Sequence, residues 1–426
     1  MKSTQNKKIQ QVKETTMVVG IDVGSEKHYF RAFNWRGIEL TKKPIPFSNS
    51  MVGFKSFYEE VTRLMEQNDL EEPLVGFEPT GHYWFNLGQF LSGKNIRFVM
   101  VNPLHVHKTK ELDDNSPSKN DRKDPRVIAN LVRDGRYFYT YMPTGVYAEL
   151  RNASNRRFVL TEELIRSKNR LQKWIAVYFP EYKGIYTHID SRGGLMVLKT
   201  APTPEEVVKL GVDGIIQIWK DAKLRGNGHK KAMLIVNAAS QSIGLTEGLE
   251  EARMEIQDLI EDYELQVKRL EKVNSLIENL CKQIKYVDKL LEIKGIGMIT
   301  IAGFIAEVGD ITRFDNAKEL QKLAGLELVA DSSGKHNGKT RIRKHLRYLL
   351  VQAAASVIGK NEEFRQIHEY YTTRDNNPLK KMQSLIAVAC KLIRVFYVIL
   401  TKGKSYDASK MLEDIKRPVT TKAKAA

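Results

Sequence analysis

The chain has 426 residues, of which 42% are hydrophobic, so it is long enough for two or three domains with buried cores. Lys and Arg outnumber Asp and Glu by 68 to 51, and the resulting net charge of +17 favours a polyanionic partner, most simply nucleic acid. The only cysteines, Cys281 and Cys390, are far apart, which argues against a disulfide framework or a thiolate zinc site and fits a reducing cytoplasm.

The N-terminal third alternates between strand and helix patterns. Residues 1–16 are basic, lack the apolar region of a secretory signal, and are predicted to be a disordered arm. The spacing of apolar residues then predicts strands at 17–24, 28–35, 37–45, 73–81 and 96–102, and helices at 51–67 and 83–93. Such alternation predicts an α/β domain with a central sheet over residues 17–145.

Two acids stand at the ends of predicted strands. Asp22 lies in GIDVGS, after a buried run, and Glu78 lies in VGFEPTG. A carboxylate on an apolar strand is costly to bury unless it is paired or bound to a cation. Each motif alone also fits a structural acid in a turn. Actin-like ATPases and sugar kinases open with a motif like GIDVGS, but the chain shows no second Gly-rich phosphate loop.

A second pair of acids lies in SPSKNDRKDPRVIANLVRDGR, residues 116–136. Pro125 is favoured at the first position of a helix, so a helix is predicted to start there with Asp124 as its N-cap. Asp121 and Asp124 are three residues apart, on one side of a helical turn, where they repel each other unless a cation lies between them. The alternative is that Asp124 only caps the helix and Asp121 pairs with a neighbouring Arg.

Together, Asp22, Glu78, Asp121 and Asp124 would provide four oxygen ligands for two Mg²⁺ ions about 4 Å apart, the arrangement that activates phosphodiesters. Basic residues surround the second pair and would meet the phosphates of a nucleic acid. They are Lys119, Arg122, Lys123 and Arg126.

Residues 146–291 are predicted to be a helical linker that ends in a coiled coil. The stretch 251–291 lacks Gly and Pro and keeps apolar residues at 3–4 spacing, with one stammer. This pattern favours a homo-oligomer, a dimer or a tetramer. The alternative is a long helix that packs within its own chain.

Residues 292–402 are predicted to form a mainly helical domain, and 403–426 a basic tail. The Gly295-Ile296-Gly297 turn between apolar segments looks like a helix-hairpin-helix, whose N–H groups can receive a phosphate, although a tight turn explains it equally well. The apolar segment 385–400 is interrupted by Lys391 and Arg394, so we expect a core helix and no membrane span.

A serine pair lies in this last domain, in AGLELVADSSGKHNGKTRIRKHLR. On physical grounds alone, residues 331–334 are a polar turn. The cations that follow can hold a scissile phosphate and help a hydroxyl attack it. They are Lys335, His336, Lys339, Arg341, Arg343, Lys344 and Arg347.

These motifs resemble one family. GIDVG, GFEPTGHYW, VNP and KNDRKDPRVIANLV are similar to the RuvC-like (RNase H-like) DEDD domain of transposases of the insertion sequence 110 type, relatives of the Piv invertases. IKGIGMITIAGFIAEVGDITRFDNAKELQKLAGL is similar to the second, serine transposase domain of that family. The resemblance implies that the four acids are catalytic and bind Mg²⁺. It also implies a serine nucleophile that bonds covalently to a DNA phosphate.

For that nucleophile, Ser333 is the closer match because it directly precedes Gly334, and Ser332 is the fallback. In one respect the chain departs from the family: TRIRKHLR lacks the Gly that family members often carry shortly before the final Leu-Arg.

The resemblance further implies a recombinase that a bridge RNA guides to donor and target DNA, in the bacterial cytoplasm at the nucleoid. Candidate nucleic-acid contacts lie between His105 and Arg126 and in a second basic stretch. That stretch contains Arg156, Arg157, Arg166, Lys168 and Arg170. Trp174 and Tyr178 are expected in the core rather than stacked on bases. The competing hypotheses are a metal-dependent RuvC-like nuclease or junction resolvase, which needs no serine, and a non-enzymatic nucleic-acid-binding protein.

Overall fold

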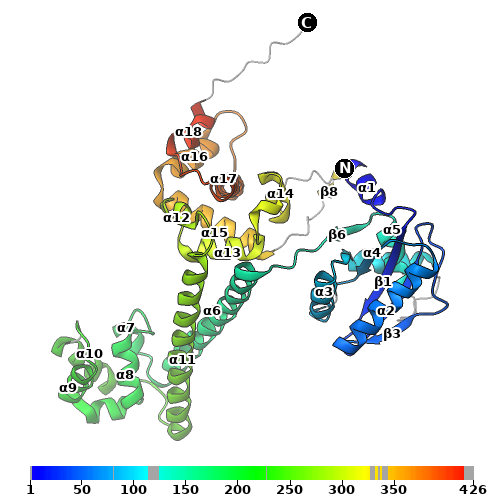
Figure 1. Ribbon diagram of the computed structural model, residues 1–426. Coiled ribbons are helices and arrows are strands. Elements are labelled where there is room, and N and C mark those ends of the chain that lie inside the picture. Colours follow the sequence, from blue (N-terminus) through cyan, green and yellow to red (C-terminus); the bar gives the residue numbers. More distant parts are fainter. Residues whose placement is uncertain are drawn as a thin grey trace. The chain divides into compact units, whose positions relative to one another are not determined.

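The computed structural model describes residues 2–79, 81–113, 124–226, 228–326, 332–333, 336–337 and 344–416. The chain divides into two compact units, Met1–Met142 and Pro143–Ala426 (Figure 1).

The first unit is built on a mixed six-stranded sheet with strand order β3-β2-β1-β4-β5-β6. Strands β1, β4 and β5 are parallel to one another, and the other neighbours pair antiparallel. The strands are β1 (Thr16–Val23), β2 (Lys27–Phe33), β3 (Ile45–Ser48), β4 (Glu72–Phe77), β5 (Arg97–Val101) and β6 (Tyr137–Tyr139). This confirms the predicted α/β domain.

Helices cover both faces of the sheet. The helices in the described part of this unit are α1 (Lys2–Ile9), α2 (Met51–Gln67), α3 (Trp84–Gly93), α4 (Pro103–Asp113) and α5 (Asp124–Arg133). Apolar side chains of α2 and α3 share one buried cluster with one face of the sheet, and those of α4 and α5 share a second cluster with the other face. The helices predicted at 51–67 and 83–93 are confirmed.

Two predictions for this unit are wrong. The strand predicted at 37–45 is a turn and an extended loop, and β3 begins only at Ile45, because Gly37 adopts a left-handed φ of 90° and its N–H closes a turn onto the Asn34 carbonyl. Part of the basic arm predicted to be disordered forms α1. This helix is held because the Lys8 amine donates to the carbonyl of Tyr137, a residue far away in the sequence.

In the described residues of the second unit, the regular structure is helical apart from one two-stranded ladder. Its helices are α6 (Gly145–Tyr178), α7 (Tyr182–Ile185), α8 (Arg192–Thr200), α9 (Pro204–Asp221), α10 (His229–Ser240), α11 (Leu249–Cys281), α12 (Val287–Leu291), α13 (Met298–Val308), the 3₁₀ turn η1 (Ile311–Arg313), α14 (Ala317–Leu323), α15 (Lys344–Lys360), α16 (Glu362–Thr373), α17 (Lys381–Lys402) and α18 (Ala408–Lys416). The ladder pairs β7 (Ser332–Ser333) with β8 (His336–Asn337).

Helices α6 and α11 form a long antiparallel pair within the chain (Figure 1). Arg157 Nε donates to Asn274 Oδ1 at 2.9 Å, and further along α6, Ser167 Oγ donates to Gln266 Oε1 at 3.0 Å. Most apolar residues of α11 are buried in two clusters of this unit, so packing within the chain accounts for much of their spacing, while Met254, Leu265 and Leu276 are exposed. The single helix predicted over 251–291 is wrong, because α11 ends at Cys281 and the left-handed Tyr286, with φ of 67°, precedes α12.

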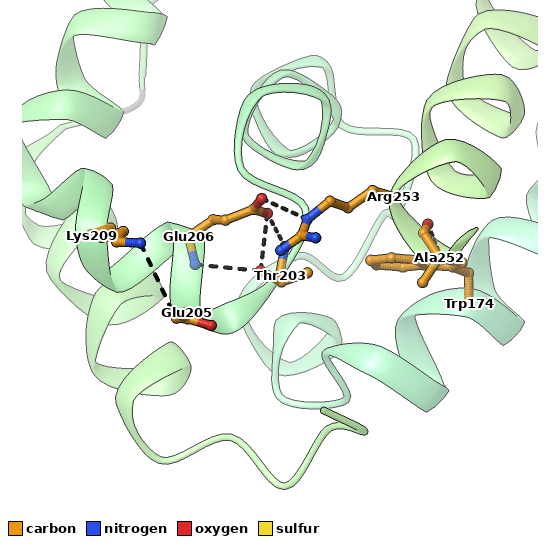
Figure 2. A network of polar contacts seen from close by, with 7 residues as sticks. All are labelled: Trp174, Thr203, Glu205, Glu206, Lys209, Ala252 and Arg253. Atoms are coloured by element: carbon orange, nitrogen blue, oxygen red, sulfur yellow. Dashed lines mark hydrogen bonds and ion pairs between the residues drawn. The ribbon is translucent and has the colours of Figure 1, made fainter. Parts of the chain in front are cut away.

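Helices α7 to α10 lie between α6 and α11 in the sequence and share a core with them. Figure 2 shows how α9 is fastened: the Glu206 carboxylate accepts the Thr203 backbone N–H at 3.0 Å in a capping box and the Arg253 Nε of α11 at 2.8 Å. Beside it, Trp174 Nε1 of α6 donates to the Ala252 carbonyl at 2.9 Å. One carboxylate therefore caps α9 and ties it to α11.

In the last part of the chain, helices α12, α14, α15 and α16 pack against α17. By length and composition α17 could cross a membrane, but Val388, Leu392 and Phe396 are completely buried in the core of this unit. The prediction of a core helix over 385–400 is confirmed.

We predict that Glu206→Ala loosens α9 locally, because it removes the carboxylate half of the capping box and the ion pair with Arg253. The expected loss is ~1 kcal/mol, which speeds amide hydrogen exchange in residues 204–221 by about fivefold. The matched control is Glu205→Ala, since Glu205 reaches only Lys209 at 3.9 Å and both of these side chains are largely exposed. Equal exchange in the two variants would contradict this account.

Candidate active site

Two of the predicted acids leave the sheet at the same edge. In the parallel pair of β1 and β4, Ile21 lies opposite Phe77. Asp22 and Glu78 are the next residues along each chain, and both are half-buried. Because neighbouring strands are about 4.8 Å apart, the sheet brings these two carboxylates to adjacent positions.

The side of the sheet that Asp22 occupies is fixed by strand alternation. Val19 and Ile21 are buried in the cluster with α2 and α3, whereas Val18 is buried in the cluster with α4 and α5. Successive side chains of a strand point to opposite faces, so Gly20 and Asp22 belong to the face that α5 covers.

The third acid arrives at this face on α5, which begins at Asp124 as the sequence predicted. A Cβ atom added to Gly20 would lie 1.9 Å from the Pro125 carbonyl oxygen, far inside van der Waals contact. The first turn of α5 therefore rests on the backbone of β1, two residues before Asp22. This backbone contact places Asp124 toward the end of the sheet that carries Asp22 and Glu78.

A second glycine, Gly76, also allows α5 to pack closely on the sheet. Gly76 pairs with Gly20 across β1 and β4, and a Cβ added to it would lie 2.3 Å from Val132 Cγ2 on α5. Our sequence analysis missed this pair. The signal was present, since each strand carries a glycine two residues before its acid, in GID and in GFE.

The turn after Asp22 is closed by a buried histidine. The Gly24 N–H donates to His28 Nδ1 at 3.2 Å, and His28 is completely buried against Phe47 and Phe54. Burial lowers the pKa of the His28 imidazole, which keeps the ring neutral and Nδ1 able to accept.

The fourth acid, Asp121, lies outside the described residues, as do Lys119, Arg122 and Lys123. Within the described part of the chain, no group of three or more His, Cys, Asp or Glu residues is arranged to hold a metal ion. The structure thus gathers Asp22, Glu78 and Asp124 at one end of the β1–β4–α5 layer without completing a metal cage. Their carboxylate oxygens are the hard ligands that Mg²⁺ prefers.

The candidate nucleophiles belong to the second unit. Ser332 and Ser333 form β7, and Ser333 pairs with His336 of β8. The predicted polar turn is therefore part of a short antiparallel ladder. Residues 334–335 and most of the predicted cations of this segment lie outside the described residues.

The Gly295–Gly297 turn does connect two helices, α12 and α13, as predicted. Gly295 has a left-handed φ of 100°, and its carbonyl accepts the Ser356 hydroxyl at 2.7 Å, so this glycine packs on α15. On Gly297, by contrast, an added Cβ would meet no described atom within 4 Å. The first turn of α13 is therefore the more open part of the motif.

The candidate nucleic-acid contacts on α6 divide into two groups. Arg157 donates to Asn274, and Lys168 pairs with Asp190 at 2.6 Å, so both take part in the fold. The other three are exposed: Arg156, Arg166 and Arg170. Trp174 is 2% exposed, which confirms that it is a core residue.

Two family models match parts of this chain. A family model for the DEDD transposases of IS110 elements, described as "Transposase", matches residues 19–180, which include all four acids. A second model, "Transposase IS116/IS110/IS902 family", matches residues 287–371, which include both serines.

Relatives match over most of the chain. The 44.8 kDa uncharacterized protein of insertion element IS116 from Streptomyces clavuligerus is 25% identical over 392 residues, 90% of this chain and 94% of that protein. The 42 kDa uncharacterized protein of IS900 from Mycobacterium paratuberculosis is 24% identical over 391 residues, 91% and 96% of the two chains. The transposase for IS1111A from Coxiella burnetii is 24% identical over 338 residues, 76% of each.

The matched domains define the class of the protein, a DNA transposase. Since the two family models together match more than half of the sequence, the chain belongs to the IS110 family of insertion-sequence transposases.

We predict that Gly20→Ala displaces the first turn of α5, because the added methyl group meets backbone that cannot rotate away. The expected cost is about 1–3 kcal/mol, measured as faster hydrogen exchange in α5 and β1. Gly93→Ala is the matched control in the same unit, since a Cβ there meets no described atom within 4 Å. A Gly20→Ala protein that exchanges like the Gly93→Ala protein would show that α5 does not rest on β1.

Proposed function

We propose that this transposase is an RNA-guided DNA recombinase that cuts and rejoins strands through a phosphoserine intermediate, with Mg²⁺ held by Asp22, Glu78, Asp121 and Asp124. The observation that supports the proposal is that Asp22, Glu78 and Asp124 lie toward the same end of β1, β4 and α5, within the segment that the DEDD transposase model matches.

The acids would hold the metal, and the metal would supply Lewis-acid stabilisation of the negative charge that builds on the phosphate. A hard-oxygen donor set at a half-exposed sheet edge leaves room for a phosphate beside the ligands. The exposed Arg126, two residues after Asp124, is placed to meet the adjoining backbone of the nucleic acid. These residues bind and orient the strand.

Ser333 would be the nucleophile. Its hydroxyl oxygen forms a bond to phosphorus as the bond from phosphorus to one strand oxygen breaks, the serine proton passes to a base, and the departing oxygen is protonated. Since one phosphodiester replaces another, the bond energy is retained and a second DNA hydroxyl can reverse the step. A metal-dependent nuclease or junction resolvase, which would share the acids, would use water and leave no protein–DNA bond.

In this proposal the protein binds a bridge RNA together with donor and target DNA, and it acts as a homo-oligomer. It would work in the bacterial cytoplasm, at the nucleoid. The net charge of +17 and the exposed Arg156, Arg166 and Arg170 on α6 support polyanion binding. The acids and the serines lie in different units, so the active site would be composite.

We predict that Ser333→Ala abolishes the covalent protein–DNA adduct while the binding of RNA and DNA persists. The measurement is a denaturing gel with labelled DNA that flanks the gene, using protein purified from cells with its co-purifying RNA. Ser332→Ala is the matched control and is expected to keep the adduct.

An adduct that survives in Ser333→Ala and is lost in Ser332→Ala would move the nucleophile to Ser332. Strand cleavage without an adduct in the unchanged protein would favour hydrolysis by water and contradict the phosphoserine route.

A further inference from the structure

A groove of about 770 Å³ lies in the second unit, between the helices α6, α13 and α15. Its volume falls in the range of ~300–1,000 Å³ that pockets for organic ligands occupy. Three apolar side chains at its wall remain open to solvent in this structure: Phe158 is 43% exposed, Ile165 54% and Tyr348 62%. Clustered exposed apolar residues of this kind mark a binding surface.

The aromatic rings of the groove are held in place. The Phe158 and His345 rings meet edge to face with centroids 5.1 Å apart, and His345 Nδ1 lies 2.9 Å from Glu307 Oε1 of α13. These contacts fix the His345 ring and one edge of Phe158. The Phe158 and His345 rings therefore form a fixed aromatic surface on which a flat aromatic ligand can stack.

The charge around the groove indicates which flat partner fits. Arg157, which donates to Asn274, and Glu162 line it, and the exposed Arg156 and Arg166 flank the lining residues on α6. Polar groups are also present at the wall, including the Thr300 side chain in the first turn of α13 and Gln352 on α15. Aromatic faces with arginines beside them bind single-stranded nucleic acids, where each base has a stacking face and each phosphate a negative charge.

The groove also lies beside the parts of this unit proposed to meet DNA. Ile299 and Thr300 line it directly after the Gly295–Gly297 turn, and His345 follows the first residue of α15, the helix that comes after the serine ladder in the sequence. We infer that this groove receives an unpaired nucleobase of the bound nucleic acid, stacked against Phe158 and Tyr348. A paired base hides both its faces in the duplex and does not fit this wall.

This inference rests on the proposed function only in that the partner is a nucleic acid, and it does not depend on the serine chemistry. A second copy of the chain is the competing occupant. The exposed Arg156 and Arg166 beside the groove favour the nucleic acid, because each can pair with a backbone phosphate.

The experiment uses the full chain and two probes, a DNA and an RNA oligonucleotide of about ten nucleotides that contain 5-iodouracil. Ultraviolet light links 5-iodouracil to adjacent aromatic side chains, and mass spectrometry of the digest locates the linkage. The expected result is a crosslink to Phe158, His345 or Tyr348 with at least one probe. The comparison of the two probes tells whether the base comes from DNA or from RNA.

Binding by variants provides the second measurement. Phe158→Ala and Tyr348→Ala are each expected to weaken binding of the crosslinking probe by roughly tenfold. The matched control is Tyr370→Ala, since Tyr370 is 39% exposed on α16 and does not line the groove; its affinity is expected to stay within about twofold.

Crosslinks found only outside the groove, or groove variants that bind like the control, would overturn the inference. The inference would also be overturned if the groove variants changed the sedimentation of the protein and left probe binding unchanged. That result would assign the groove to contact with a second copy of the chain. An unchanged protein that binds neither probe overturns the inference as well. The adduct assay separates these outcomes from failure of the proposed function, because it detects the serine bond whether or not the groove holds a base.

Discussion

The close packing of α5 on the backbones of β1 and β4 is the contact on which the candidate active site depends. Gly20 and Gly76 are register partners, and any larger residue at either position would push the helix outward. Pro125 adds a fixed φ to the first turn of that helix. Backbone geometry therefore sets the distance of α5 from the sheet and the residue at which the helix starts. As a result, Asp124 lies toward the strand ends that carry Asp22 and Glu78.

The second unit is organised around one long helix pair, α6 and α11. The α6–α11 pair extends from the core around α17 to the core of α7–α10, and polar bonds such as Ser167 to Gln266 fix its register. Most apolar residues of these two helices are buried within the chain, but several on α6 and on the neighbouring α15 remain exposed. The groove between α6 and α15 is lined by several of these exposed apolar residues, including Phe158, Ile165 and Tyr348.

Much of the fold was predictable because local signals agreed with tertiary packing. Helix α2 matches its predicted range, since Ser50 caps it and Phe54, Phe57, Val61 and Leu64 form one buried stripe. The errors occurred where tertiary contacts decide. Helix α1 depends on Tyr137, far away in the sequence, and the break before α12 requires a left-handed tyrosine, for which the sequence gives no local signal.

The acids were predictable from their places at strand ends and at a helix start, but their common location was not, because it depends on the depth at which α5 sits. The role assigned to Ser333 came from family resemblance, since two serines in a polar turn have no chemical signature of their own.

The measurement that tests the account most directly is anomalous diffraction from crystals of the full chain grown with Mn²⁺ in place of Mg²⁺. The account predicts Mn²⁺ bound by Asp22, Glu78 and Asp124, with Asp121 completing the site. An ordered acid edge with no ion, or ions bound only elsewhere, would contradict it.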